Sequence, residues 1–274
     1  DDIVGTYTLD VGSVQIKDGA NNDVTSNYDI GTSSGTLEVI RRPLEITADN
    51  DSTTYGDGYT AVDTAFTITD GSLAASDGTA TDTLTLSMSM GDSPNTGEET
   101  YAPVGTYTIT PGSALIKDGS NVDVTANYDI TYVDGELSVD HRQLSITADN
   151  ATKTYGNTFT PDNTAYTISS GSLASSRTST QDSLIVNITA SDTPSGESAG
   201  DPVGTYALTP SASISDAMEN DVTANYDITY VDGTLTIEAL ELAPADPWFT
   251  GQQRYITSSR TSTTAKVLLS ATIN

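Results

Sequence analysis

The sequence predicts an all-β fold, built from tandem immunoglobulin-like β-sandwich repeats that form an elongated rod. Three observations support this prediction: apolar residues alternate with polar ones, Asp-Gly and Gly-Ser turns separate the alternating runs, and long stretches recur about 100 residues apart. No segment shows helical periodicity over three turns. A β-grasp-like module is the alternative architecture for each repeat.

Internal repetition divides the chain into units. The stretch that begins at Arg41 returns in related form at His141, and the motif Val-Gly-Thr-Tyr begins at Val4, Val104 and Val203. Such self-similarity is typical of repeat proteins. We therefore predict the second half of a repeat at 1–40, complete repeats at 41–140 and 141–239, and a diverged first half-repeat or donor-strand tail at 240–274.

Alternating runs predict about seven half-buried strands in each complete repeat. In the first repeat the clearest runs lie at 44–48, 66–68, 84–90, 107–109, 128–132 and 137–139. Asp134-Gly135 separates the last two runs and predicts a hairpin turn. The connection at 139–144 has no Gly- or Ser-rich spacer, so we expect a stiff joint and a rod rather than flexibly linked domains.

Composition argues against several function classes. With 38 acidic and 10 basic residues, the chain has a formal net charge of −28 and repels phosphate backbones, so we expect no nucleic-acid partner. The absence of cysteine excludes disulfides and thiolate metal sites. No apolar run approaches the roughly 18 residues that a membrane span requires, so we expect no membrane span.

Two sequence features that suggest catalysis have simpler explanations. Residues 31–35 match the G-x-S-x-G nucleophile pattern, but the equivalent positions in the other repeats are ordinary turn sequence. His141 is the only histidine, so a histidine base or metal cluster cannot recur from repeat to repeat. We expect that the chain is not an enzyme.

Acidic loops recur at equivalent positions of the repeats and suggest calcium as a cofactor. Calcium prefers hard oxygen ligands, and bound ions would stiffen a rod. Asp and Asn are also ordinary turn formers, so solvated turns are the alternative interpretation. The candidate calcium ligands are Asp18, Asn22, Asp23, Asp118, Asp123, Asp216 and Asp221.

The segment 240–274 provides candidate assembly contacts. It contains a Trp-Phe pair outside the repeat pattern, which would anchor a partner if exposed. A later apolar run aligns with 184–186 and could add as a strand to an open sheet edge of a neighbouring molecule. The candidate assembly residues are Trp248, Phe249, Val267, Leu268 and Leu269.

Three motifs in order resemble the MBG and YDG-type tandem repeats of large bacterial surface adhesins. They are Tyr-Gly-Asp at 55–57, Val-Gly-Thr-Tyr at 104–107 and Asn-Tyr-Asp-Ile at 127–130, and the resemblance covers residues 1 to about 239. It implies a secreted or cell-surface bacterial protein with a role in cell adhesion, in some members to mucus glycans. The resemblance supplies no catalytic residues.

Three functional hypotheses remain open. In the first, the chain is an extracellular structural subunit of a surface filament or fibre, which joins copies of itself head to tail by β-strand complementation. In the second, it is a stalk segment of a long cell-surface adhesin, cut or processed from a longer precursor. In the third, the repeats themselves bind glycans or a host surface.

Overall fold

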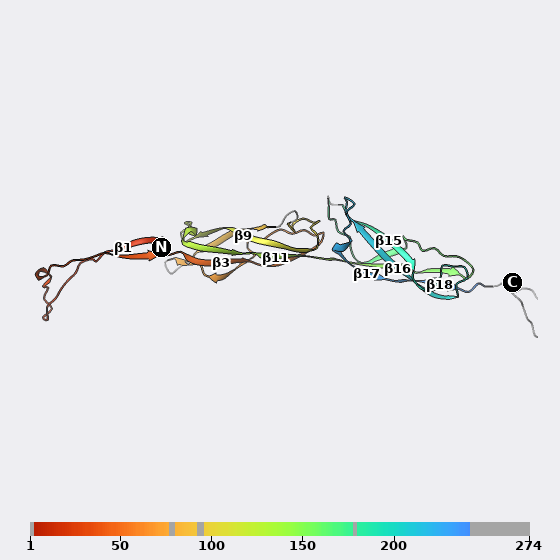
Figure 1. The fold of residues 1–274 in the computed structure, drawn as a ribbon, viewed down its shortest axis with the longest axis horizontal. Helices are drawn as coiled ribbons and strands as arrows, with labels where there is room; N and C mark the ends of the chain where they lie inside the picture. The colour runs from red at the N-terminus through yellow and green to blue at the C-terminus, as the bar shows by residue number, and fades with distance from the viewer. Residues whose placement is uncertain (1–2, 77–79, 92–95, 178–179, 242–274) are drawn as a thin grey trace, which may run out of the picture.

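The computed structural model describes residues 3–76, 80–91, 96–177 and 180–241. They form an elongated rod of β-strands, in which a thin N-terminal extension, the first repeat and the second repeat follow one another (Figure 1). Helical structure in this part of the chain is limited to three short 3₁₀ turns at Thr25–Asn27, Thr125–Asn127 and Thr223–Asn225. None of the described helices has the length and apolar character to cross a membrane. The prediction of an all-β fold is confirmed, and the shape agrees with the predicted rod.

The strands of the two complete repeats correspond one to one, apart from a short additional pair in the first. The first repeat contains β3 (Arg42–Ala48), β4 (Asp51–Thr54), β5 (Phe66–Gly71), β6 (Ala75–Ser76), β7 (Ala80–Thr81), β8 (Thr83–Met90), β9 (Gly105–Lys117), β10 (Tyr128–Val133) and β11 (Gly135–Asp140). The second contains β12 (Arg142–Ala148), β13 (Ala151–Thr154), β14 (Tyr166–Gly171), β15 (Ser183–Ala190), β16 (Gly204–Ser215), β17 (Tyr226–Val231) and β18 (Gly233–Glu238). Before them lie β1 (Gly5–Leu9) and β2 (Gly35–Val39).

Each complete repeat consists of two sheets that enclose apolar side chains. The sheet orders are β10-β3-β5 and β4-β11-β9-β8 in the first repeat, and β14-β12-β17 and β13-β18-β16-β15 in the second. Leu44 comes from the first of these sheets, Leu86 and Ile116 come from the second, and all three are buried in one cluster. Each repeat also contains two parallel strand pairs, such as β3 with β10, which alternation alone did not predict. The two-sheet architecture agrees with the predicted sandwich, whereas its immunoglobulin-like connectivity stays a prediction.

Two neighbouring segments cross together from one sheet of the first repeat to the other. β3 and β10 are paired in one sheet, and their continuations β4 and β11 are paired in the second. At the crossing, the Glu136 amide donates to Asn50 Oδ1 at 2.8 Å. A Cβ atom on Gly135 would lie 2.7 Å from the Ala48 carbonyl oxygen, so no side chain fits there. The hairpin predicted at Asp134-Gly135 is therefore wrong, because β10 and β11 pair with different strands.

Residues 3–40 reproduce part of a repeat without its covering strands. β1 pairs with β2 in the register in which β9 pairs with β11. Leu37 is nevertheless 45% exposed, whereas the equivalent Leu137 is 0% exposed. Tyr28 is 57% exposed and Tyr128 only 5%. The difference arises because no strands equivalent to β3, β4, β5 and β8 cover 3–40 in the described part of the chain, where β1 and β2 form a thin extension of the rod (Figure 1).

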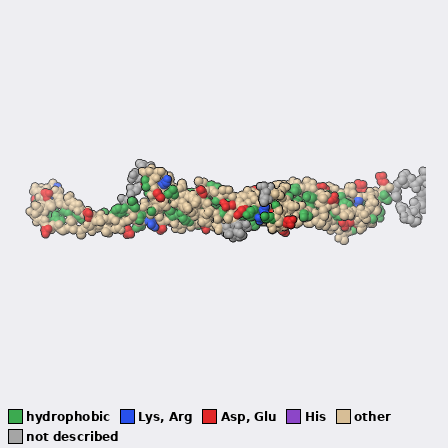
Figure 2. Space-filling view, turned by 90° about the horizontal axis from the view of Figure 1, so that it is seen from above, with side chains coloured by type: hydrophobic (Ala, Val, Ile, Leu, Met, Phe, Trp, Pro, Cys, Tyr) green, Lys and Arg blue, Asp and Glu red, His purple; other side chains and the backbone are tan. Residues whose placement is uncertain are grey.

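Among the charged side chains on the surface of the rod, acidic ones predominate. Figure 2 shows acidic side chains spread along the visible face, with few basic side chains among them. This distribution accords with the 38 acidic and 10 basic residues of the chain. Such a surface repels other copies side by side at low ionic strength, and added salt screens the repulsion.

Candidate functional site: the joint between the two repeats

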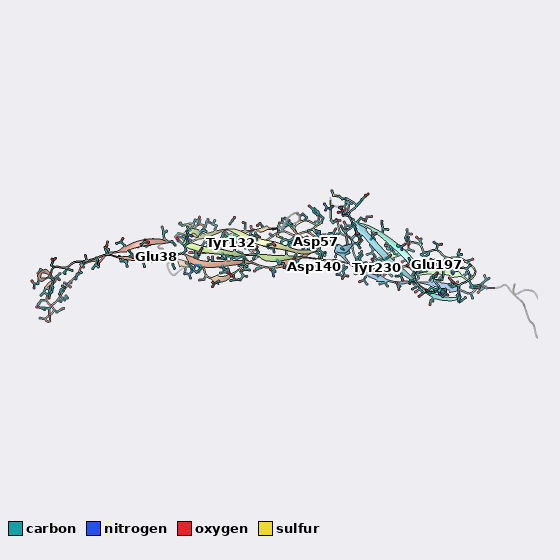
Figure 3. The ribbon with its side chains drawn as sticks, viewed as in Figure 1. Glu38, Asp57, Tyr132, Asp140, Glu197 and Tyr230 are labelled. Carbon is teal, nitrogen blue, oxygen red and sulfur yellow. The ribbon has the colours of Figure 1, made fainter. Side chains whose placement is uncertain are left out.

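The two complete repeats meet in a packed joint rather than across a linker. β11 ends at Asp140 and β12 begins at Arg142, so His141 alone separates the two strands. Figure 3 labels Asp57 and Asp140 where the first repeat ends and the second begins. Around this connection, two loops of the first repeat contact the second repeat. The loops lie at 55–57 and 100–104, and they contact Arg142, 174–177 and 225–226.

Tyr55 forms the centre of the joint. Its side chain comes from the loop after β4 and is 0% exposed. Its ring meets the Tyr226 ring nearly edge-on, with 5.6 Å between centroids, an arrangement that aromatic pairs prefer. The Tyr55 hydroxyl donates to Asp182 Oδ2 at 3.4 Å, and the Tyr226 hydroxyl donates to the same oxygen at 2.6 Å. One residue of the first repeat thus completes a buried polar cluster of the second.

The Asp182 carboxyl group organises this cluster. It is 3% exposed, and it also accepts a hydrogen bond from the Ser176 hydroxyl. Burial raises the pKa of Tyr226, and the hydrogen bond to Asp182 raises it further. Burial likewise raises the pKa of Tyr55. Both phenols therefore keep their protons and remain donors, which offsets the cost of burying the carboxyl group.

Gly56 allows the two repeats to approach closely. Its φ angle is +93°, a conformation that favours glycine. A Cβ atom there would lie 2.4 Å from Ala174 Cβ, so a larger residue would push the repeats apart. The Gly56 amide also donates to the Thr100 carbonyl at 3.1 Å. Two loops of the first repeat therefore support each other at the joint.

Arg142 connects the loop after β4 with the second repeat. Its Nη1 atom donates to the Tyr55 carbonyl at 3.0 Å and to Asp57 Oδ1 at 2.8 Å. Its Nε atom donates to the Ser172 carbonyl at 3.0 Å. Because the Asp57 side chain is 57% exposed, we expect the ion pair itself to contribute little. The larger effect comes from the two carbonyl contacts, of which the one to Tyr55 crosses the joint and the one to Ser172 fixes Arg142 on the second repeat.

A second set of contacts flanks Tyr55. The guanidinium group of Arg177 lies 4.0 Å from the centroid of the Tyr101 ring, within the range of a cation–π interaction. The Val104 amide donates to Asn225 Oδ1 at 3.1 Å. Buried apolar side chains from both repeats also belong to one continuous cluster. These contacts oppose bending of the joint in more than one direction.

Within the described ranges, the same groups also occur where no further repeat packs against them. Tyr155 follows β13 as Tyr55 follows β4, yet it is 44% exposed. A Cβ atom on Gly156 would meet no atom within 4 Å. At the start of the first repeat, Arg42 Nε donates to the Ser72 carbonyl at 2.7 Å, just as Arg142 Nε donates to the Ser172 carbonyl in the second repeat. The chain therefore contains matched controls for the residues of the joint.

A Tyr-Gly pair thus occurs once in each complete repeat, and in the first repeat it makes the joint. The family model for the MBG domain (YGX type) matches residues 44–138 and 144–236. The chain belongs to the MBG domain family. Tandem MBG domains are typical of surface adhesin-type proteins. No curated protein was found to match the chain.

In this MBG protein the Tyr-Gly pair has a clear physical role. The tyrosine of the first repeat supplies apolar surface and a hydroxyl donor to the second repeat. The glycine beside it leaves room for Ala174 of the second repeat to approach closely. In the sequence, the pair is recognisable only as a repeat signature. Its partners in the second repeat, Arg142, Asp182 and Tyr226, were not predicted. A signal was present in the repeat alignment, because their counterparts in the first repeat are Arg42, Asp82 and Tyr128.

Carboxylates of the predicted calcium loops accept hydrogen bonds from their own loops. Asp118 Oδ1 accepts from the amides of Ser120 at 2.9 Å and Val122 at 2.8 Å, and Asp123 Oδ1 accepts from the Thr125 amide at 2.9 Å. The carboxylates of Asp18, Asp23, Asp216 and Asp221 accept backbone amides in the same way, and Asn22 is one of the donors to Asp18. Across the described ranges, no three His, Cys, Asp or Glu side chains are grouped to hold a metal ion. Calcium binding stays a prediction.

The predicted assembly residues cannot be placed in this architecture. Trp248, Phe249, Val267, Leu268 and Leu269 all lie outside the described residues. Their role in assembly therefore stays a prediction.

We expect the Arg142→Ala variant to lose about 1–2 kcal/mol of unfolding free energy, because carbonyl groups on both sides of the joint lose a charged donor. The matched control is Arg42→Ala, which removes the equivalent contacts to Ser72 but none to a Tyr-Gly loop. Urea unfolding measures both variants. Equal losses would contradict a role for Arg142 across the joint.

We expect Asp23 to titrate at unusually low pH. The Thr25 hydroxyl is the main donor to its carboxylate and, with Gln15 and the Thr25 amide, lowers the pKa to about 2. Because an unfolded aspartate titrates near pH ~3.9, this contribution to stability is complete above that pH and is lost as the pH falls toward 2. NMR titration of the carboxyl carbon measures the midpoint, and Thr25→Val should raise it. A midpoint near ~3.9 in the unmodified chain would argue against these hydrogen bonds.

Proposed function

We propose that this chain is a non-catalytic, extracellular spacer: a stiff segment of a bacterial cell-surface adhesin that holds a binding region away from the cell. The observation that carries the proposal is the joint, in which Tyr55 of one repeat is buried in the next. A spacer holds a binding region at a distance only if thermal motion does not bend it at the joints between its repeats. Membership of the MBG family supports a surface location.

The chemistry of the joint suits this role. A single residue connects the two repeats, so their separation cannot change without breaking the contacts of Tyr55 and Arg142. The contacts are mostly apolar packing and short-range hydrogen bonds, and those of Tyr55 are buried, so salt screens them little. The joint is therefore expected to remain stiff at environmental ionic strength.

A distance measurement between the repeats tests the spacer proposal. The chain has no cysteine, so Ser87→Cys and Asn187→Cys place two spin labels at equivalent exposed positions of β8 and β15. We expect electron-spin resonance to give one narrow distance distribution. A flexible Gly-Ser insertion after His141 is the control and should broaden it. A distribution that is equally broad without the insertion would overturn the proposal.

Head-to-tail assembly by β-strand complementation is the second candidate. It is favoured by the exposed core positions of 3–40, among them Leu9 at 52%, Tyr28 at 57% and Leu37 at 45%. A first half-repeat from a neighbour, supplied by 240–274, would cover them. The test is negative-stain electron microscopy of the full chain beside a variant that lacks 240–274. Filaments that depend on this segment support assembly, and short single rods from both samples contradict it.

Glycan or host-surface binding by the repeats is a third proposal, and it rests on the family resemblance. Binding of the full chain to a glycan array would support it, and uniform background would contradict it.

A further inference from the structure

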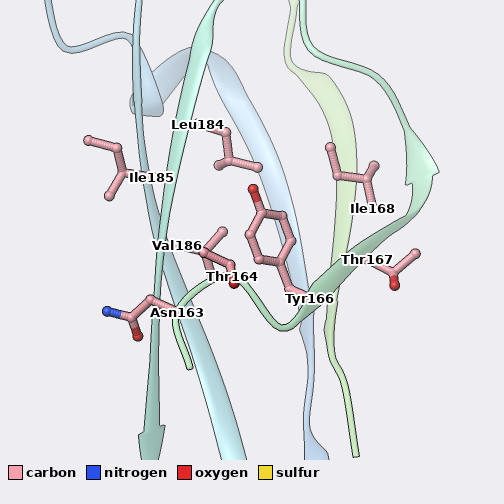
Figure 4. Close-up of a pocket in the computed structure, with 8 residues that line it drawn as sticks. All are labelled: Asn163, Thr164, Tyr166, Thr167, Ile168, Leu184, Ile185 and Val186. Carbon is pink, nitrogen blue, oxygen red and sulfur yellow. The ribbon is translucent and has the colours of Figure 1, made fainter. Parts of the chain in front are cut away.

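An open groove lies along one side of the second repeat. It lies between β14, the edge strand of one sheet, and β15, the edge strand of the other, and has a volume of about 730 Å³. Figure 4 shows Tyr166, Ile168 and Leu184 among the side chains that line it. Ile168 is 37% exposed, and Ile185 on β15 is 65% exposed. Thr85 occupies the position of Ile185 in the first repeat, so the second repeat presents the more apolar edge.

β15 also directs backbone polar groups toward this groove. The Ile188 amide donates to Asn163 Oδ1 at 2.8 Å instead of to β16. β15 pairs with β16 in continuous antiparallel register, in which the direction of the amides alternates. The amides of Leu184 and Val186 therefore also point away from β16. Among the described residues no strand pairs with this edge of β15, and an apolar groove beside such an edge is suited to an extended segment that adds as a further strand.

The chain itself contains a segment with the required pattern. Residues 264–273 read Thr-Ala-Lys-Val-Leu-Leu-Ser-Ala-Thr-Ile. In an extended conformation, one face of this segment is entirely apolar and consists of Ala265, Val267, Leu269, Ala271 and Ile273. The other face carries mostly polar side chains, including Lys266 and Ser270.

Charge also favours this occupant. Residues 242–274 contain three basic side chains, Arg254, Arg260 and Lys266, and one acidic side chain, Asp246. The rest of the chain holds 37 of the 38 acidic residues and 7 of the 10 basic ones. A weakly cationic segment is therefore attracted to a strongly acidic rod, although salt weakens this attraction.

We propose that residues 264–273 dock as an added β-strand in the groove between β14 and β15 of the same molecule. The apolar face covers Tyr166, Ile168 and Leu184, and the backbone pairs with the free edge of β15. The 22 residues at 242–263 can span about 70 Å when extended, more than twice the length of an eight-residue strand. Attachment to the same chain also supplies a high effective concentration.

This docking has a consequence for the rod. It covers an edge that would otherwise be open to pairing with other chains. It goes beyond the spacer proposal and does not depend on it. A segment held on its own molecule cannot complete a neighbour, so docking and head-to-tail assembly exclude each other in one molecule.

Amide hydrogen exchange of the full chain, followed by NMR, tests the proposal. We expect Leu269→Asp, which places a charge on the docking face, to accelerate exchange at Leu184 and Val186 by about tenfold or more. Ser270→Asp is the matched control on the opposite face and should leave both amides protected. Both substitutions lie outside the two complete repeats, so we expect the repeats to stay folded in both variants. A synthetic peptide of 262–274, added in excess, should restore protection to the Leu269→Asp chain.

Two outcomes would overturn the proposal. One is equal exchange at Leu184 and Val186 in the unmodified chain and both variants. The other is protection that appears only at concentrations where sedimentation shows dimers, because the segment would then occupy the groove of a second copy.

Discussion

The Tyr55→Ala variant is expected to lose about 3–5 kcal/mol of unfolding free energy, the cost of removing a large buried aromatic side chain. Tyr55 is 0% exposed and packs against Tyr226 with 5.6 Å between ring centroids. Its loss leaves a cavity between the repeats and removes one donor from Asp182. The two repeats should then unfold in separate steps rather than together.

Tyr155→Ala is the matched control for this prediction. Tyr155 occupies the same motif in the second repeat but is 44% exposed, so its removal should cost about 1 kcal/mol or less. Urea unfolding measures stability, and the spin-label pair at positions 87 and 187 measures stiffness. We expect the distance distribution to broaden only in Tyr55→Ala. If both variants lose equal stability and the distribution stays narrow, Tyr55 does not hold the joint.

The Gly135→Ala variant is expected to destabilise the first repeat by about 3 kcal/mol or more, because the new methyl group meets two carbonyl oxygens. A Cβ atom would lie 2.7 Å from the Ala48 oxygen and 2.8 Å from the Asp49 oxygen. β3, which ends at Ala48, is paired on both sides and cannot move away freely. The substitution should therefore separate the two segments where they cross between the sheets.

Gly35→Ala tests the same sequence position without the crossing. Its Cβ atom would lie 3.8 Å from Leu9 Cβ, an ordinary contact, so we expect a change within about 0.5 kcal/mol. Thermal unfolding compares the two variants, and NMR shows which residues lose structure. In Gly135→Ala the signals of 41–140 should be affected most. Equal melting temperatures for the two variants would show that the close approach of the two segments at the crossing is not the reason for a glycine at position 135.

Much of the local structure was predictable from the residues alone. The alternation of Leu44, Ile46 and Ala48 correctly predicted a strand whose core-facing side chains are buried. The same holds for Leu137 and Val139. These predictions succeeded because a strand exposes alternate side chains to opposite faces, a property of neighbouring residues. The Asp-Gly hairpin failed because turn residues show that the chain changes course but not which strand it joins next.

The joint was harder to predict than the strands. The short connection at His141 predicted a stiff joint, which stays a prediction, and it did not predict which side chains meet there. Tyr55 and Asp182 are 127 positions apart, and Arg142 donates to a carbonyl 87 positions away. Equivalent residues elsewhere, such as Tyr155, have the same local sequence and a different environment. Motif recurrence alone therefore could not distinguish a buried contact from an exposed one.

The sequence by itself determined the period, the β-strands, the acidic character and the MBG family of this protein. These properties depend on composition and on patterns within one repeat. Only the tertiary structure decided that strands pair in parallel, that two segments cross at Gly135 and that Tyr55 reaches Asp182. The physical reason is that pairing and burial join residues far apart in the chain, and their free energy depends on which surfaces meet.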